Sequence, residues 1–212
     1  NVPHLADVEQ LIRILGNHGV DYAVNGRRGH DGSMYARTIH FTARDITTTT
    51  APYELVSKMR ASFWVVGPLL ARMGEARVSL PGGCAIGTRP VDLFIEGLAK
   101  FGASVDIEDG YVVTKAPRGG LVGTHYVFPK VSVGATHVML MAGALAKGET
   151  LIENAAMEPE VGNLADCLNA MGAKIEGAAT AEKMVDADRA AQLATAKQMT
   201  QRAEDFYVSL GM

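Results

Sequence analysis

The chain has 212 residues, of which 48% are hydrophobic and 20% are charged, with a formal net charge of −3. This composition is typical of a globular protein with a sizeable core, and the charge argues against a nucleic-acid-binding surface, which needs a basic excess. No apolar run is long enough to cross a bilayer, and two cysteines are too few for a disulfide scaffold, so we expect a cytoplasmic protein. The six histidines show no metal-ligand spacing, so we expect neither a metal nor a cofactor.

The chain is predicted to begin with a helix and a hairpin. Apolar residues at three- and four-residue spacing predict a helix over residues 4–18. Alternation predicts a strand over 20–24, and the dipeptide Asn25-Gly26 is a typical hairpin turn. We expect a polar loop over 26–37 and a return strand over 38–41.

A long helix is predicted next, opening at Pro52 and running to about Met73. Proline suits the first turn of a helix, where its missing N–H is not needed. A second proline, Pro68, interrupts the pattern, so we expect a break or kink near Gly67.

The second half of the chain alternates strands and helices. Strands are predicted over 76–80, 103–108, 111–115, 125–128, 150–153 and 173–176, and helices over 91–101, 135–146 and 158–171. Three helix ends share the pattern Leu-x-x-x-Gly before a strand, with the glycines at 19, 102 and 172. A second pattern, Gly-Glu at 74–75 and 148–149, closes two apolar helices. The sequence therefore predicts repeats of about 75 residues, each a strand–helix–strand–helix unit followed by a hairpin.

The segment over residues 79–93, SLPGGCAIGTRPVDL, joins a predicted strand to a predicted helix. Three glycines free the backbone around one thiol, Cys84. Pro90 suits the first turn of the helix, and Arg89 precedes it. A helix N-terminus beside an arginine is a natural anion site, and cationic surroundings make a thiol reactive. The ordinary alternative is that a lone cysteine is a small buried hydrophobe.

The pattern P-G-G-C-x-I-G-x-R-P-V-D-L closely resembles the active-site loop of the UDP-N-acetylglucosamine enolpyruvyl transferases, also called 1-carboxyvinyltransferases. The resemblance covers roughly residues 1–177. It implies an α/β (α+β) fold of repeated βαβαββ units with the helices inside, an inside-out α/β barrel that is incomplete here. It also implies transfer of the enolpyruvyl group from phosphoenolpyruvate to the 3′-hydroxyl of UDP-N-acetylglucosamine, the first committed step of peptidoglycan synthesis. That reaction passes through a tetrahedral ketal and needs several cations, an acid and a base.

The resemblance assigns roles to four residues. Cys84 matches a cysteine that is implicated as an acid, forms an adduct with phosphoenolpyruvate and is alkylated by fosfomycin. Arg89 matches a phosphate-contacting arginine, and Arg60 matches another substrate-contacting arginine, although an arginine on a helix is ordinarily a solvated side chain. The family places Trp64 near the nucleotide sugar, whereas a single tryptophan is more often part of the core.

Two segments match the parts of the family that hold UDP. Their residues are Arg89, Pro90, Val91, Asp92 and Leu93 in the first and Lys130, Val131, Ser132 and Val133 in the second. Asp92 can accept a hydrogen bond from the uracil N–H, Lys130 can neutralise the diphosphate, and Ser132 can donate to it. Without the resemblance, the second segment would be interpreted as an ordinary loop.

Three residues of the last predicted helix have weaker assignments. Glu158 and Glu160 flank Pro159 at the helix start, where a capping charge is about as plausible as a role in a site. Cys167 lies among apolar residues and is predicted to be in the core.

The chain is expected to hold only part of the enzyme. The family's N-terminal Lys-Asn pair is expected upstream of residue 1, and its catalytic aspartate and further arginines in a second domain, which would be a partner of this chain. We therefore expect a partial enolpyruvyl transferase domain over 1–177 that is inactive alone. The remainder, 178–212, is rich in Ala, Gln, Lys and Asp and is predicted to be a helical tail unrelated to the family, without partner strands, that proteases remove first.

Two other functions stay open. The related shikimate-pathway enolpyruvyl transferases share the fold but lack the loop cysteine and the UDP segments, so Cys84 and residues 130–133 argue against that activity. A non-catalytic remnant would bind the nucleotide sugar without turning it over.

Overall fold

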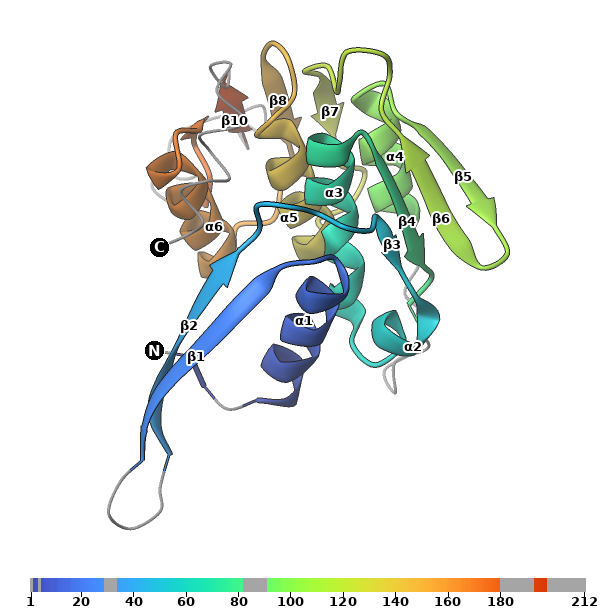
Figure 1. Cartoon of the computed structure of the whole chain (residues 1–212). Helices are drawn as coiled ribbons and strands as arrows, with labels where there is room; N and C mark the ends of the chain where they lie inside the picture. The colour runs from blue at the N-terminus through green and yellow to red at the C-terminus, as the bar shows by residue number, and fades with distance from the viewer. Residues whose placement is uncertain (1, 4, 29–33, 82–90, 180–192, 198–212) are drawn as a thin grey trace.

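The computed structural model describes residues 2–3, 5–28, 34–81, 91–179 and 193–197, which form mixed helices and strands (Figure 1). The helices are α1 (Ala6–Asn17), α2 (Tyr53–Val56), the 3₁₀ helix η1 (Arg60–Val65), α3 (Val66–Met73), α4 (Asp92–Lys100), α5 (Val133–Gly143) and α6 (Pro159–Ala170). The strands are β1 (Asp21–Arg28), β2 (Met34–Thr42), β3 (Thr50–Ala51), β4 (Glu75–Ser79), β5 (Ser104–Glu108), β6 (Tyr111–Lys115), β7 (His125–Val127), β8 (Thr150–Glu153), β9 (Lys174–Glu176) and β10 (Leu193–Lys197).

Two four-stranded sheets share one topology. Their strand orders are β3-β4-β6-β5 and β7-β8-β10-β9. In each, the first two strands are parallel, and the second strand pairs antiparallel with the far strand of a β–β pair. Helices connect the strands in the same order, so residues 50–115 and 125–197 are two βαβαββ units. The repeat predicted from the sequence is confirmed.

A third copy of the last part of the unit lies at the start of the chain. There α1 is followed by the antiparallel hairpin β1–β2, which projects from the body in Figure 1. The three predicted glycine caps at 19, 102 and 172 have positive φ values of 91°, 86° and 106°. Because side chains disfavour this conformation, glycine is what lets each helix turn sharply into the strand that follows.

The core is built around α5, an apolar helix of the second unit. It contacts α3 and α4 of the first unit and α6 of its own. Eight of its 11 residues are buried, which is why its sequence has no polar face. Close helix packing depends on small residues: a Cβ on Gly67 of α3 would lie 2.9 Å from the Val138 carbonyl oxygen.

The hairpin is longer than predicted, and its predicted turn is wrong. Asn25 and Gly26 lie inside β1, paired with Thr38 and Arg37. The pairing register shifts between Gly26 and Arg28, which is an irregularity that glycine accommodates inside a strand. The residues that join the two strands, 29–33, lie outside the described residues.

The predicted long helix is three shorter elements, and its break is not at Gly67. The helical pattern stops after α2, resumes at η1 and continues directly into α3. Pro68 is the third residue of α3, within the first turn, where proline is tolerated better than in a helix interior. The break falls instead at residues 57–59.

The predicted absence of strands in the tail is also wrong. Residues 193–197 form β10, which lies between β8 and β9 and pairs with both. The Ala-, Thr- and Lys-containing sequence of this segment has only a weak intrinsic preference for helix or strand. Pairing with the open edges of β8 and β9 outweighs that preference. The rest of the predicted helical tail lies outside the described residues, and the domain boundary at 177 stays a prediction.

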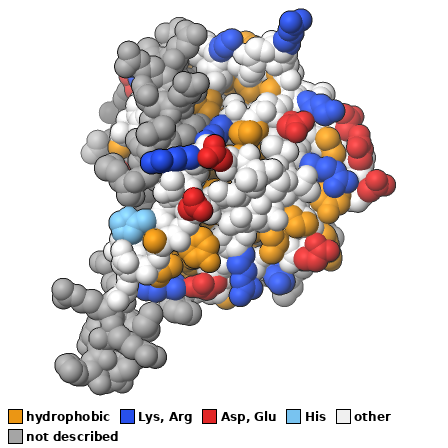
Figure 2. Space-filling model, in the orientation of Figure 1, with side chains coloured by type: hydrophobic (Ala, Val, Ile, Leu, Met, Phe, Trp, Pro, Cys, Tyr) orange, Lys and Arg blue, Asp and Glu red, His pale blue; other side chains and the backbone are white. Residues whose placement is uncertain are grey.

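Charged side chains of both signs are interspersed over the described part of the face in Figure 2. Within the part of the chain that the structure describes, every helix is too short or too polar to span a bilayer.

Candidate functional site

The two segments predicted to hold UDP lie side by side. Asp92 is the first residue of α4, and Lys130 lies in the connection between β7 and α5. Lys130 Nζ is 3.9 Å from Asp92 Oδ2, and the two side chains are 63% and 46% exposed. Residues from two different βαβαββ units therefore meet at one surface, with both charged groups accessible to a ligand.

Tyr126 of β7 connects β7 to α4 near Asp92. Its hydroxyl donates a hydrogen bond of 3.3 Å to Glu96 Oε2, one turn after Asp92 on α4. Burial, followed by the negative charges of Glu96 and Asp92, raises the pKa of Tyr126 to about 12. The phenol therefore stays protonated at neutral pH and acts as a fixed donor between β7 and α4.

Ser132 is the N-cap of α5. Its hydroxyl accepts from the backbone N–H of Ala135 at 3.4 Å, and its carbonyl accepts from the Thr136 hydroxyl at 2.8 Å. A serine hydroxyl that accepts in this way still has an O–H to donate. The remaining N–H groups of the first turn give this helix end a partial positive charge that suits a phosphate.

The indole of Trp64 lies over the first turns of α5. Its ring stacks on His137, with centroids 4.6 Å apart and planes at 19°. Trp64 is partly buried against the core, so the core and site assignments made from the sequence are not exclusive. Arg60 opens the same 3₁₀ helix and is also partly buried.

The remaining described residues of the two segments divide by exposure. Leu93 is 5% exposed and belongs to the core, and Val91 and Val133 pack against the core. Only Val131, at 55% exposed, presents its side chain freely. For the three packed residues, the backbone is therefore the part most available to a ligand. Cys84, Arg89 and Pro90 lie outside the described residues.

Cys167 is exposed, so its predicted place in the core is wrong. The buried residues of α6 are Val161, Ala165 and Leu168, which recur at four- and three-residue spacing. Cys167 is one position off that face, with its Sγ 3.7 Å from Met171 Sδ. Neighbours in sequence were misleading because adjacent helical residues point about 100° apart.

Glu158 is the N-cap of α6, yet its side chain makes no capping hydrogen bond. It lines an open pocket of about 350 Å³ with Val131, Ala155 and Met157, next to the second UDP segment. One carboxylate oxygen, Oε2, is buried without a hydrogen-bond partner among the residues that the structure describes. Glu160 is exposed in the first turn, where its negative charge interacts favourably with the partial positive charge of the helix N-terminus.

Comparison with known protein families identifies the family of the chain. The model of EPSP synthase (3-phosphoshikimate 1-carboxyvinyltransferase) matches residues 1–193. The chain belongs to the EPSP synthase family.

Curated relatives of high sequence identity carry a more specific name than the family model. The chain is 77% identical over 180 residues to a UDP-N-acetylglucosamine 1-carboxyvinyltransferase of Chelativorans sp., and 79% identical over 178 residues to one of Brucella ovis. These alignments cover 85% and 84% of this chain, but only 42% and 41% of the relatives. The chain thus spans less than half the length of the relatives that it matches.

Solved structures support the fold of the EPSP synthase family. The enolpyruvyl transferase NikO of Streptomyces tendae matches with a TM-score of 0.65 at 18% identity, covering 92% of this chain and 41% of that one. An EPSP synthase of Acinetobacter baumannii matches with a TM-score of 0.59 at 17% identity, covering 90% and 39%. The predicted fold of repeated βαβαββ units of the enolpyruvyl transferase type is confirmed.

Sequence reasoning missed two residues that contact the candidate site in this member of the EPSP synthase family. Tyr126 ties β7 to α4 beneath Asp92, and His137 stacks on Trp64. Neither has a motif of its own: one lies on a three-residue strand and the other on an apolar helix. A polar residue in an otherwise apolar helix was the signal available for His137.

Proposed function

We propose that the chain forms the UDP-sugar-binding and loop-cysteine part of an enzyme that transfers the enolpyruvyl group from phosphoenolpyruvate to the 3′-hydroxyl of UDP-N-acetylglucosamine. The 3′-oxygen of the sugar bonds to C2 of phosphoenolpyruvate as a base takes the hydroxyl proton and an acid gives a proton to C3, which forms the tetrahedral ketal. Loss of phosphate, with a proton from C3, then restores the double bond. The proposed setting is the cytoplasm, and the product would feed peptidoglycan synthesis.

One observation carries the proposal: the 3.9 Å approach of Lys130 to Asp92. Although Asp92 and Lys130 are 38 positions apart in the sequence, this approach joins the two UDP segments into one surface with an accessible cation and an accessible carboxylate. Lys130 and the N-terminus of α5 would hold the diphosphate, with Ser132 as a donor. Asp92 would accept from the uracil N–H, which gives base selectivity.

The other residues have proposed roles around this surface. Trp64 would lie along the sugar, and Arg60 and Arg89 would hold anionic groups of the substrates. The backbone of Pro90, Val91, Leu93, Val131 and Val133 would complete the nucleotide site. Cys84 would supply the acid that protonates C3.

The shikimate-pathway reaction is the alternative within the family, and the family model is described by that activity. The relatives at 77–79% identity are named for the UDP-N-acetylglucosamine reaction instead. Identity at this level, together with the Asp92–Lys130 surface, favours the nucleotide sugar over 3-phosphoshikimate.

Calorimetry on the full chain tests the proposal. We expect UDP-N-acetylglucosamine to bind and 3-phosphoshikimate not to bind, with no phosphate released when phosphoenolpyruvate is added to the chain alone. Absence of heat with the nucleotide sugar would overturn the binding assignment, and phosphate release would overturn the expectation that this chain is inactive by itself. Selective modification of Cys84, described below, separates part of an enzyme from a binding remnant.

A further inference from the structure

The plane of the Trp64 indole is determined by α5. One face of the ring stacks on His137 at 4.6 Å between centroids. Its edge crosses Gly134, where a Cβ would lie 2.8 Å from Nε1 of Trp64. Any side chain at position 134 would therefore displace the indole, and the glycine is what permits this close approach.

The imidazole that supports the indole is fixed in turn. His137 is 6% exposed, and its Nδ1 lies 2.7 Å from the carbonyl oxygen of Val133, one turn earlier on the same helix. A carbonyl can only accept, so this bond requires the hydrogen on Nδ1 and sets both the tautomer and the orientation of the ring. The ring cannot rotate without breaking that bond, so it offers a rigid platform.

The same turn of α5 follows the proposed diphosphate segment directly. Val133 and Gly134 come straight after the N-cap Ser132, and Lys130 lies two residues before that cap. The backbone that would bind the diphosphate is therefore also the backbone that orients His137 and, through it, Trp64. A shift of either ring relative to the phosphates would need a change in the helix itself.

We propose that His137 is a positioning residue that holds the indole of Trp64 in the orientation needed to contact the sugar of a nucleotide-sugar ligand. This role rests on the proposed function, because it takes the ligand to be UDP-N-acetylglucosamine. His137 acts through Trp64, by ring stacking and the Val133 bond. Through this positioning by His137, Trp64 contributes to selectivity for the sugar and not for the uridine diphosphate.

The sole tryptophan of the chain gives a direct readout. His137→Leu removes the ring and is expected to increase acrylamide quenching of Trp64 fluorescence. Since an aromatic pair contributes about 0.5–1.5 kcal/mol, we expect the Kd for UDP-N-acetylglucosamine to rise roughly two- to twelvefold. The Kd for UDP, which lacks the sugar, should stay within about twofold. His137→Phe keeps a stacking ring and should restore most of both properties.

Met139→Leu is the matched control, because Met139 is a fully buried residue of the same helix that lies against Gly97 of α4. Equal effects of His137→Leu and Met139→Leu would overturn the proposal in favour of general loosening of α5. Unchanged quenching in His137→Leu, or equal weakening of UDP and the nucleotide sugar, would also overturn it. If the unaltered chain binds no nucleotide sugar, the proposed function fails and the sugar-specific role fails with it, whereas the quenching comparison still decides whether His137 orients Trp64.

Discussion

At the scale of single residues, the pair formed by Asp92 and Lys130 is expected to affect ligand binding more than stability. Both side chains are about half exposed, and exposed ion pairs contribute about 0–1 kcal/mol to folding. Such a pair can separate at low cost when a ligand brings its own charges. Removing either partner should therefore leave the fold intact and change the affinity for ligand.

Lys130→Ala is expected to weaken UDP-N-acetylglucosamine binding by about 1–3 kcal/mol, the range for charge-assisted hydrogen bonds. Its effect should vanish for uridine, which has no phosphate, whereas Asp92→Ala should weaken both ligands because it acts on the base. Lys147→Ala, at an exposed lysine after α5, is the control for net charge. Calorimetry with the two ligands measures all three variants, and wild-type affinity in both site variants would remove the UDP assignment.

Fosfomycin should alkylate Cys84 and not Cys167. Its phosphonate would be held by the cations proposed for phosphoenolpyruvate, whereas Cys167 is exposed on α6 with no basic residue in the last turn of that helix. UDP-N-acetylglucosamine should speed the reaction. Because Cys167 is exposed, a neutral alkylating reagent would not distinguish the two thiols, so the anionic reagent is needed. Peptide mass spectrometry locates the adduct, and equal amounts on both cysteines would count against the functional role of Cys84.

His18 should make stability depend on pH in the mildly acidic range. Burial lowers its pKa from 6.5, and the hydrogen bond from Nδ1 to the Thr48 carbonyl, 2.8 Å long, partly opposes this shift. Its Nε2 is buried without a partner. The unfolded chain therefore binds a proton more readily than the folded chain, so stability is full above pH 6.5 and declines as the pH falls below it.

Thermal unfolding between pH 7.5 and pH 5 measures this effect. His18→Asn can still donate to the Thr48 carbonyl but does not titrate, so it should lose this part of the pH dependence. An identical pH profile for the variant and the unaltered chain would exclude His18 as the source.

At the scale of elements, most helices and strands follow from sequence pattern, and the exceptions have physical causes. The hairpin β5–β6 forms as predicted because Asp109 and Gly110 both take the positive φ that a tight turn needs, which this dipeptide tolerates. The dipeptide Asn25-Gly26 carries the same local signal, yet pairing with β2 continues through it. Local turn preference decides the outcome only where no longer ladder competes with it.

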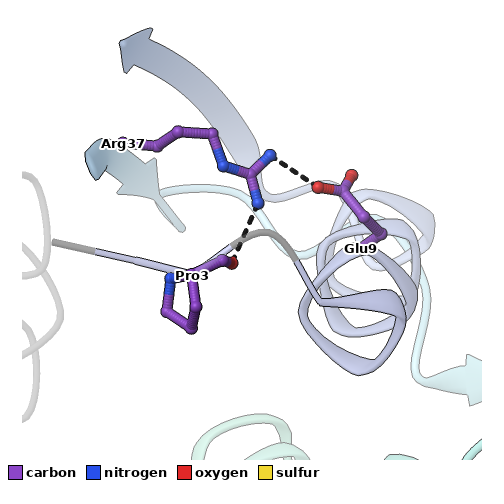
Figure 3. Close-up of polar contacts among 3 residues, drawn as sticks. All are labelled: Pro3, Glu9 and Arg37. Carbon is purple, nitrogen blue, oxygen red and sulfur yellow. Dashed lines mark hydrogen bonds and ion pairs between the residues drawn. The ribbon is translucent and has the colours of Figure 1, made fainter. Parts of the chain in front are cut away.

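The hairpin β1–β2 is attached to α1 by an ion pair between the buried Arg37 and the partly exposed Glu9 (Figure 3). Arg37 is 6% exposed; its Nη1 donates to Glu9 Oε1 at 2.6 Å and its Nη2 to the Pro3 carbonyl at 3.1 Å. Glu9→Gln leaves the guanidinium without its countercharge and should destabilise the fold by about 1–3 kcal/mol. Glu54→Gln, at an exposed glutamate of α2, should change little.

Urea unfolding of these variants and of Arg37→Met gives the comparison. The double variant Glu9→Gln with Arg37→Met should lose less than the sum of the single losses, because the second change removes the unpaired charge. Additive losses would show that the two side chains do not interact.

At the scale of the whole molecule, the candidate site lies where the two βαβαββ units meet. Asp92 starts a helix of the first unit, whereas Lys130 and Ser132 precede a helix of the second. Periodicity predicted both units but could not show which loops of different units meet, since that depends on how α4 and α5 pack. The resemblance to a family supplied the pairing, and it could not supply Tyr126 or His137, which act through contacts that no motif records.

The last strand, β10, completes the four-stranded sheet of the second unit. In the first unit β6 pairs with β4 and β5, and in the second β10 takes the same place between β8 and β9. Thr195 is central, aligned with both Leu151 and Glu176. Thr195→Pro removes a backbone N–H from a strand with neighbours on both sides, so a ladder hydrogen bond is lost and its acceptor is left unpaired, which should cost about 1–3 kcal/mol.

Thr195→Val keeps the backbone N–H and has a high strand preference, so it should be neutral or slightly stabilising. Hydrogen exchange of the β8 and β9 amides, measured with urea unfolding, distinguishes the two variants. If β10 closes the sheet, proline should speed exchange in both neighbouring strands and leave β4 and β6 of the first unit protected. Unchanged protection of β8 and β9 in Thr195→Pro would mean that the second unit is stable without its fourth strand, and that residues 193–197 are an appendage, as the composition of the tail had indicated.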